Sequence, residues 1–217
     1  MNNTERLLDK GLEELTTVVY KMGKVAEKAL AISINGFVED RDASEDVHEL
    51  SEILVTATVD VEEKAFGLIA KYQPVASDLR IINSYMKVAY DFERFGRYAW
   101  DITYISTHLD GESACGEWIF EYIRQMAEKV LQMVGISINS LKSLDTELVK
   151  AVTKTEQEVD DMYFKYLDKL VKEASVTNKC TISSVLVVRY LERIADHAMH
   201  IMEAVVYVTT GEKVTLR

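Results

Sequence analysis

The sequence predicts an all-α protein built as two tandem, internally repeated three-helix bundles, with six long helices in total. Proline occurs once and glycine nine times in 217 residues, which is too few for architectures that need many turns. Hydrophobic residues make up 48% of the chain, enough to form a buried core. Apolar residues also recur at alternating steps of four and three, the spacing of one face of an α-helix.

Five short segments interrupt the helical pattern and so define the helices in order. They are rich in polar, proline or glycine residues, which favour turns over continued helix. These segments are residues 39–43, 73–74, 109–113, 143–146 and 176–179. The six intervals that remain average about 30 residues, or roughly 45 Å at the rise of an α-helix. Helices of that length are typical of bundles.

The third and sixth helices show the clearest periodicity. Residues 81–102 and 187–208 each carry apolar side chains at 4-3-4-3-4-3 spacing, so each helix has one apolar stripe for packing in a bundle. Pro74 suits the first turn of the third helix, where its missing N–H costs no hydrogen bond. Asp78 then lies near the positive end of that helix.

Two halves of about 100 residues resemble one another. The string AISIN at residues 31–35 recurs as GISIN at 135–139, and FERF at 92–95 is echoed by LERI at 191–194. Three helices therefore occur twice. We place the first three-helix repeat at residues 1–110 and the second at residues 111–217.

The charge balance excludes nucleic acid as the main partner. Lys and Arg number 25 against 36 Asp and Glu, a net charge of −11 that a phosphate backbone repels. No stretch has the roughly 18 uninterrupted apolar residues of a membrane span, and the N-terminus lacks the apolar segment of a secretory signal. We expect a soluble, cytoplasmic protein that meets membranes only through its partners.

The two cysteines, Cys115 and Cys180, lack the CxxC spacing of a zinc or redox site. We expect two small packed thiols, which suits a reducing cytosol.

Four carboxylates form the strongest candidate site. Glu192 and Asp196 are four residues apart on the sixth helix, and Glu156 and Asp160 repeat that spacing on the fifth. If these two helices are neighbours, four hard oxygen donors converge and repel one another unless a cation joins them. Iron, zinc, manganese, magnesium or calcium would suit such a cluster.

A plainer interpretation stays open for these residues. Acidic pairs at this spacing are common in so acidic a chain, and these could face water beside Arg189 or Arg193. The first half also lacks the pattern, because Glu93 is present while Arg97 occupies the place of Asp196.

Other motifs give little support for catalysis. Glu45 and His48 have the Glu-x-x-His spacing of di-iron bundles, but those need it on two helices and it occurs once. His197 follows Asp196 and could assist a site there, although a lone helical histidine is more often an ordinary polar residue. Nucleotide-binding and hydrolase motifs such as GxGxxG and GxSxG are missing from the sequence.

Four strings together resemble the PhoU family of phosphate-uptake regulators, across essentially the whole chain. They are LIAKYQPVASDLR (68–80), DFERFGRYAWDI (91–102), RYLERIADHAMHI (189–201) and EAVVYVTTGE (203–212). The resemblance implies two similar three-helix bundles and a cytoplasmic negative regulator that is not an enzyme. It also implies two partners: the ATPase of the phosphate ABC transporter (PstB-like) and, where present, a phosphate-sensing histidine kinase (PhoR-like).

Some members of that family bind iron or zinc through paired E(D)xxxD motifs, one set in each bundle. Carried over to this chain, the second set is intact as Glu156, Asp160, Glu192 and Asp196. The first set is eroded, since Arg97 replaces its aspartate and its other pair falls on Ser51 and Val55. We therefore expect one metal site, in the second bundle.

The leading hypothesis is an adaptor that docks on the transporter ATPase, lowers phosphate import and takes part in phosphate signalling. The alternative is a carboxylate-bridged metalloenzyme or a metal-storage bundle unrelated to phosphate. A homodimer is also expected, because six long helices leave apolar positions exposed.

Overall fold

The computed structural model describes residues 7–109, 115–173 and 176–216, and within these ranges the chain forms α-helices and no strand. Six long helices account for nearly all of it, which confirms the predicted fold class. They are α1 (Leu7–Val38), α2 (Ser44–Tyr72), α3 (Ala76–Leu109), α4 (Glu117–Ser143), α5 (Val149–Lys172) and α6 (Asn178–Thr210).

The helix ends fall at the predicted breaks, with one correction at proline. Gln73 has left-handed backbone (φ 49°) and ends α2, and its N–H donates to the carbonyl of Ile69. Pro74 lies in the connection rather than in the first turn of α3, so that expectation was wrong. The left-handed backbone of Ala76 (φ 48°) separates Pro74 from the helical turns that follow. Asp78 does lie in the first turn of α3, as predicted.

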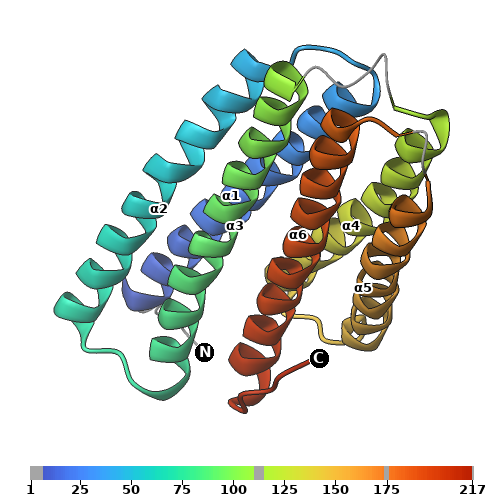
Figure 1. Ribbon diagram of the computed structural model, residues 1–217. Helices are drawn as coiled ribbons and strands as arrows, with labels where there is room; N and C mark the ends of the chain where they lie inside the picture. The colour runs from blue at the N-terminus through green and yellow to red at the C-terminus, as the bar shows by residue number, and fades with distance from the viewer. Residues whose placement is uncertain (1–6, 110–114, 174–175, 217) are drawn as a thin grey trace.

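The tandem repeat is visible in the packing (Figure 1). Helices α1, α2 and α3 contact one another, while α6 packs on both α4 and α5, which also touch each other. The two halves meet where α3 packs against α6 and α1 against α4. Helices α2 and α5 therefore lie at opposite outer edges of the molecule.

One apolar core runs through both halves. The stripes of α3 and α6 are buried as predicted, with Phe92 and Phe95 on α3 and Leu191 and Ile194 on α6 completely shielded from solvent. Burying a side chain of this size stabilises the fold by roughly 1.5–3 kcal/mol. Because these residues belong to a single cluster, the halves are joined through their interiors. The predicted boundary at residues 110–111 lies outside the described residues.

The repeated ISIN strings have equivalent local structures on α1 and α4. Ser33 on α1 and Ser137 on α4 are both buried. Their hydroxyls donate to the carbonyls three residues earlier, Leu30 at 3.0 Å and Val134 at 2.8 Å. Each buried hydroxyl therefore has its hydrogen-bond partner within its own helix.

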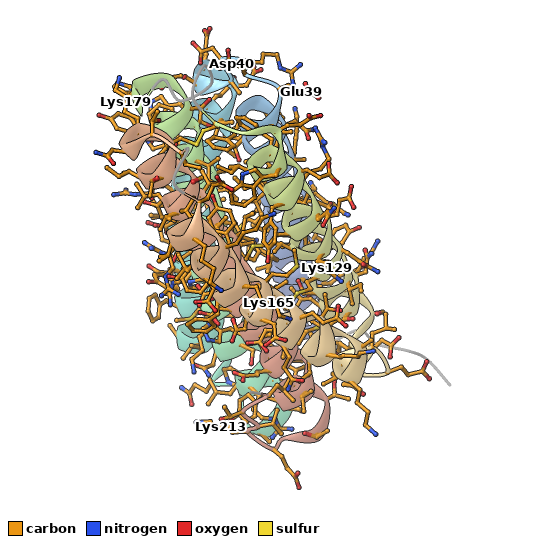
Figure 2. All side chains as sticks on the ribbon, turned by 45° about the vertical axis from the view of Figure 1, so that its right-hand side comes forward. Glu39, Asp40, Lys129, Lys165, Lys179 and Lys213 are labelled. Carbon is orange, nitrogen blue, oxygen red and sulfur yellow. A yellow bond between two sulfur atoms is a disulfide. The ribbon has the colours of Figure 1, made fainter. Side chains whose placement is uncertain are left out.

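Charged side chains cover the outer surface. Figure 2 shows side chains filling the space between helices, while Lys129 and Lys165 lie on the outside of the second half. Among the described residues, no helix contains an apolar stretch long enough to span a bilayer.

Cys115 and Cys180 form a disulfide, so the expectation of two free thiols was wrong. Cys115 lies just before α4 and Cys180 in the first turn of α6, two segments that the second bundle brings to the same end. The separation of 65 residues gives no local motif, which is why spacing could not reveal the pair. The cysteines therefore no longer favour a reducing compartment.

Candidate functional site

The four predicted carboxylates lie together in one groove between α5 and α6. Glu156 and Asp160 from α5 and Glu192 and Asp196 from α6 all line a cavity of about 360 Å³. The two helices are neighbours, as the prediction required. The i,i+4 spacing then places both pairs on facing sides.

These side chains are more buried than surface acids normally are. Glu156 is 4% exposed and Asp196 is 9% exposed. The Oε2 atom of Glu192 is buried as well, and it is held by an ion pair with Arg189. Carboxylates held this way would gain more from a cation than acids that face bulk water.

Two arginines form ion pairs with two of these carboxylates. Arg189 Nη1 lies 2.5 Å from Glu192 Oε2, and Arg193 Nη1 lies 3.4 Å from Asp196 Oδ2. Both arginines are more exposed than the acids they contact. The alternative interpretation, in which the acids pair with these arginines, is thus partly realised as well.

The pKa of Glu192 reflects the charges around it. Burial raises the pKa of its carboxyl, the negative charges of Asp196 and Asp160 raise it further, and Arg189 opposes them. Among the residues that line the groove, four carboxylates outnumber two arginines. Hard oxygen donors of this number suit iron, zinc or another divalent cation, so the residues fit the predicted metal.

The first half has an equivalent groove between α2 and α3, with different chemistry. Ser51, Val55, Glu93 and Arg97 line a cavity of about 250 Å³, at the positions that correspond to the four carboxylates. The four positions of the eroded motif therefore lie in one groove. In this groove the side chains of Ser51, Val55 and Arg97 stand where the second groove has three of its four carboxylates.

Glu45 and His48 lie in the first turns of α2, and both are exposed. The imidazole of His48 packs on Trp100, with ring centroids 4.7 Å apart. His48 is therefore an exposed residue whose ring packs on Trp100.

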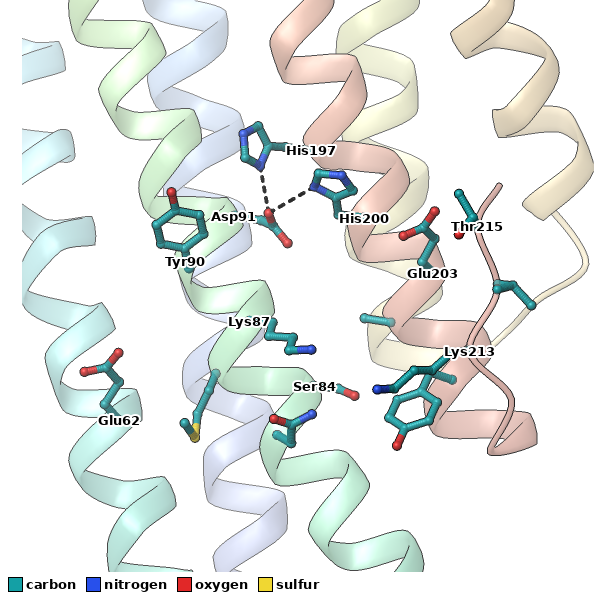
Figure 3. Close-up of a pocket in the computed structure, with 15 residues that line it drawn as sticks. Glu62, Ser84, Lys87, Tyr90, Asp91, His197, His200, Glu203, Lys213 and Thr215 are labelled. Carbon is teal, nitrogen blue, oxygen red and sulfur yellow. Dashed lines mark hydrogen bonds and ion pairs between the residues drawn. The ribbon is translucent and has the colours of Figure 1, made fainter. Parts of the chain in front are cut away.

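A third cluster, which sequence reasoning missed, lies where the halves meet (Figure 3). Asp91 on α3 faces His197 and His200 on α6, at one end of a cavity of about 750 Å³. The spacing of His197 and His200, three residues apart on one helix, was the available signal. Asp91 gave none, because its position opposite the histidines depends on how α3 packs against α6.

Comparisons with known proteins cover nearly the whole chain. The PhoU domain family model matches residues 19–105 and again residues 123–205. A relative from Clostridium acetobutylicum, named a phosphate-specific transport system accessory protein PhoU homolog, is 30% identical and is aligned over 98% of this chain and 99% of its own. One of the same name from Aquifex aeolicus is 33% identical over 94% of each chain.

Two solved PhoU structures have the same fold as this chain. The crystal structure of PhoU from Pseudomonas aeruginosa superposes with a TM-score of 0.87 and 27% identity, covering 94% of this chain and 99% of that one. The phosphate transport system regulatory protein PhoU from Streptococcus pneumoniae shares the fold, with a TM-score of 0.76, 20% identity and coverage of 96% and 99%.

Proposed function

The chain belongs to the PhoU family, and from this membership we propose that it is a non-enzymatic negative regulator of phosphate uptake. The observation that carries the proposal is the double match to the PhoU domain, together with full-length relatives named as phosphate transport accessory proteins. The regulator binds the cytoplasmic ATPase of a phosphate ABC transporter and lowers import when phosphate is plentiful. Where the cell has a phosphate-sensing histidine kinase, that kinase is a second partner.

The physical properties of the chain suit an adaptor. A rigid six-helix body with a net charge of −11 can be steered to a basic surface on a partner. Binding, rather than turnover, then produces the effect. Self-association into a homodimer is part of the same proposal.

The groove formed by Glu156, Asp160, Glu192 and Asp196 is proposed to hold iron or zinc. A bound cation would neutralise the excess charge and join α5 to α6. Metal analysis of protein purified without chelator tests this, with the Glu192→Ala/Asp196→Ala double variant as comparison. Metal that is missing from the wild type, or equally retained by the double variant, would remove the site from the proposal.

The regulatory role is tested by phosphate uptake in phosphate-rich medium. Cells lacking the protein should import labelled phosphate at an unregulated, high rate, and restoring the gene should lower it. Equal uptake in both strains would overturn the proposed function. Co-purification of the tagged protein with the transporter ATPase, against an untagged control, separates direct docking from an indirect effect.

A further inference from the structure

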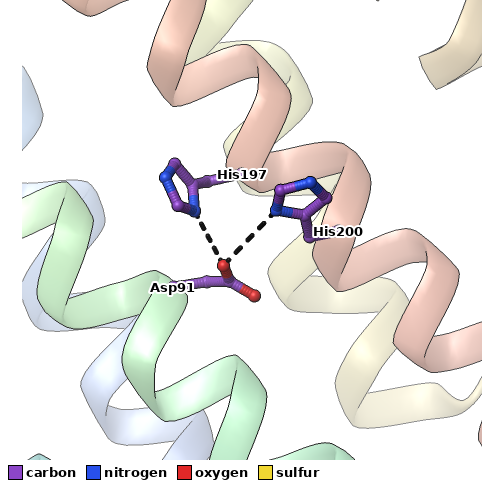
Figure 4. A group of neighbouring side chains, drawn as sticks. All are labelled: Asp91, His197 and His200. Carbon is purple, nitrogen blue, oxygen red and sulfur yellow. Dashed lines mark hydrogen bonds and ion pairs between the residues drawn. The ribbon is translucent and has the colours of Figure 1, made fainter. Parts of the chain in front are cut away.

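The junction of the two halves contains two imidazoles and a carboxylate that converge (Figure 4). His197 Nδ1 lies 2.7 Å from Asp91 Oδ1, and His200 Nδ1 lies 3.7 Å from the same oxygen. The three candidate ligand atoms all lie within 4.8 Å of one another. Asp91 and His197 are buried, whereas His200 is half-exposed and faces the large cavity.

These distances are close to those of a zinc site with three protein ligands. Bonds of about 2.0–2.2 Å in tetrahedral geometry place ligand atoms about 3.3–3.5 Å apart. The His200 pair must shorten by roughly 0.2–0.4 Å, and the His197 pair must lengthen by roughly 0.6–0.8 Å. Two imidazoles and one carboxylate also form a donor set that suits zinc better than magnesium or calcium.

A hydrogen bond with Tyr98 fixes the ring of His197 on the side away from Asp91. Arg94 donates to the hydroxyl oxygen of Tyr98 at 3.0 Å, and Arg193 donates to it at 3.4 Å. The hydroxyl proton of Tyr98 is therefore left for Nε2 of His197, 3.3 Å away. His197 Nδ1 then carries the proton that faces Asp91, so zinc binding at Nδ1 requires this proton to move to Nε2 and the Tyr98 hydroxyl to turn and accept it.

We propose that Asp91, His197 and His200 bind one Zn²⁺ ion that joins α3 to α6, with its fourth coordination position open to the 750 Å³ cavity. The site shares no residue with the carboxylate groove on α5 and α6, so it stands apart from the metal discussed above. It also does not depend on the proposed function. Because its ligands come from both halves, zinc would lock the junction between them.

The simplest competing arrangement has no metal. Asp91 and His197 would then form a buried hydrogen-bonded pair between the halves, and His200 would add a second, longer contact. Both arrangements fit the same folded chain, so a binding measurement decides between them.

The test is a titration with zinc chloride in protein labelled with ¹⁵N at histidine. A Glu156→Gln/Glu192→Gln background removes binding at the carboxylate groove. One equivalent of zinc should shift the imidazole signals of His197 and His200 and leave those of His48 and His108 in place. Calorimetry on the same background should give one zinc per chain.

Variants then assign the ligands. His200→Gln should weaken zinc binding at least tenfold, and since His200 is half-exposed, the fold should survive the change. His108→Gln, on an exposed histidine of α3, is the matched control and should bind zinc normally. Asp91→Asn, at a buried position, is a second variant that tests the same ligand set. Failure of zinc to bind in the background protein, or affinity that His200→Gln leaves unchanged, would overturn the proposal.

Discussion

The grooves of the two halves occupy equivalent places in the repeat but differ in their balance of charge. In the first half, burial raises the pKa of Asp101, and the guanidinium groups of Arg97 and Arg94 act against that rise. In the second half, burial raises the pKa of Glu192, and Asp196 adds to that rise. Two arginines line each groove, against three carboxylates in the first and four in the second, so the second keeps more negative charge for an external cation.

This contrast shows which parts of a repeat can diverge. The apolar stripes are shared because they form one core, and a change in either is felt by both halves. The groove positions lie beside the stripes, so their charges can change without altering the packing. Four predictions test this division between a common interior and separate grooves.

The largest effect should come from the shared core. Phe95 and Ile194 occupy equivalent stripe positions and are fully buried. Phe95→Ala should lower the free energy of unfolding by about 3–5 kcal/mol and Ile194→Ala by about 2–5 kcal/mol. Because the core is continuous, each variant should still unfold in one transition, as monitored by circular dichroism in urea.

The control for this pair is Phe66→Ala, which removes a ring that is 57% exposed. It should change stability by no more than about 0.5 kcal/mol. Two separate transitions, with only one moved by each core variant, would show that the halves fold independently.

The disulfide is the next largest difference between the halves. Cys115→Ser opens a loop of 65 residues in the second half and should lower the free energy of unfolding by about 2–4 kcal/mol under oxidising conditions. Cys115 is chosen because it is less buried than Cys180. With a reductant present, wild type and variant should unfold alike, and a difference that persisted would have to come from packing.

The third prediction exchanges the chemistry of the two grooves. Asp196→Asn, which keeps size while removing charge, should reduce metal affinity of the second groove at least tenfold, or about 1.4 kcal/mol. Arg97→Asp alone should give the first groove no such affinity, because Ser51 and Val55 occupy the positions of Glu156 and Asp160, and Glu52 and Asp101 line the groove at other positions. Ser51→Glu/Val55→Asp/Arg97→Asp should create it.

Calorimetry of the chelator-treated proteins measures these exchanges. Unchanged affinity in Asp196→Asn would place the metal elsewhere, and a triple variant that stayed inert would show that carboxylate positions alone do not make the site.

The sequence was sufficient for features that depend on helical periodicity. The 4-3 spacing gave the buried faces of α3 and α6, and the i,i+4 acids could be assigned to facing sides once α5 and α6 were taken as neighbours. Features that depend on contacts between distant segments were missed. The Cys115–Cys180 bond and the approach of Asp91 to His197 are both of this kind.

The smallest predicted effect concerns Glu192 in metal-free protein. Its pKa is raised on folding, so the folded state binds the proton more tightly than the unfolded state does. Ionised Glu192 therefore costs stability at neutral pH, and this cost is absent below the unfolded value of about 4.5. Stability should fall as the pH rises from there through the folded pKa. With chelator present, Glu192→Gln should be modestly more stable than wild type at pH 7, and the gain should vanish toward pH 4.5.

The same difference in stability at both pH values would mean that the gain comes from packing or from the lost contact with Arg189. The repulsion inferred among the four carboxylates would then have no measurable cost.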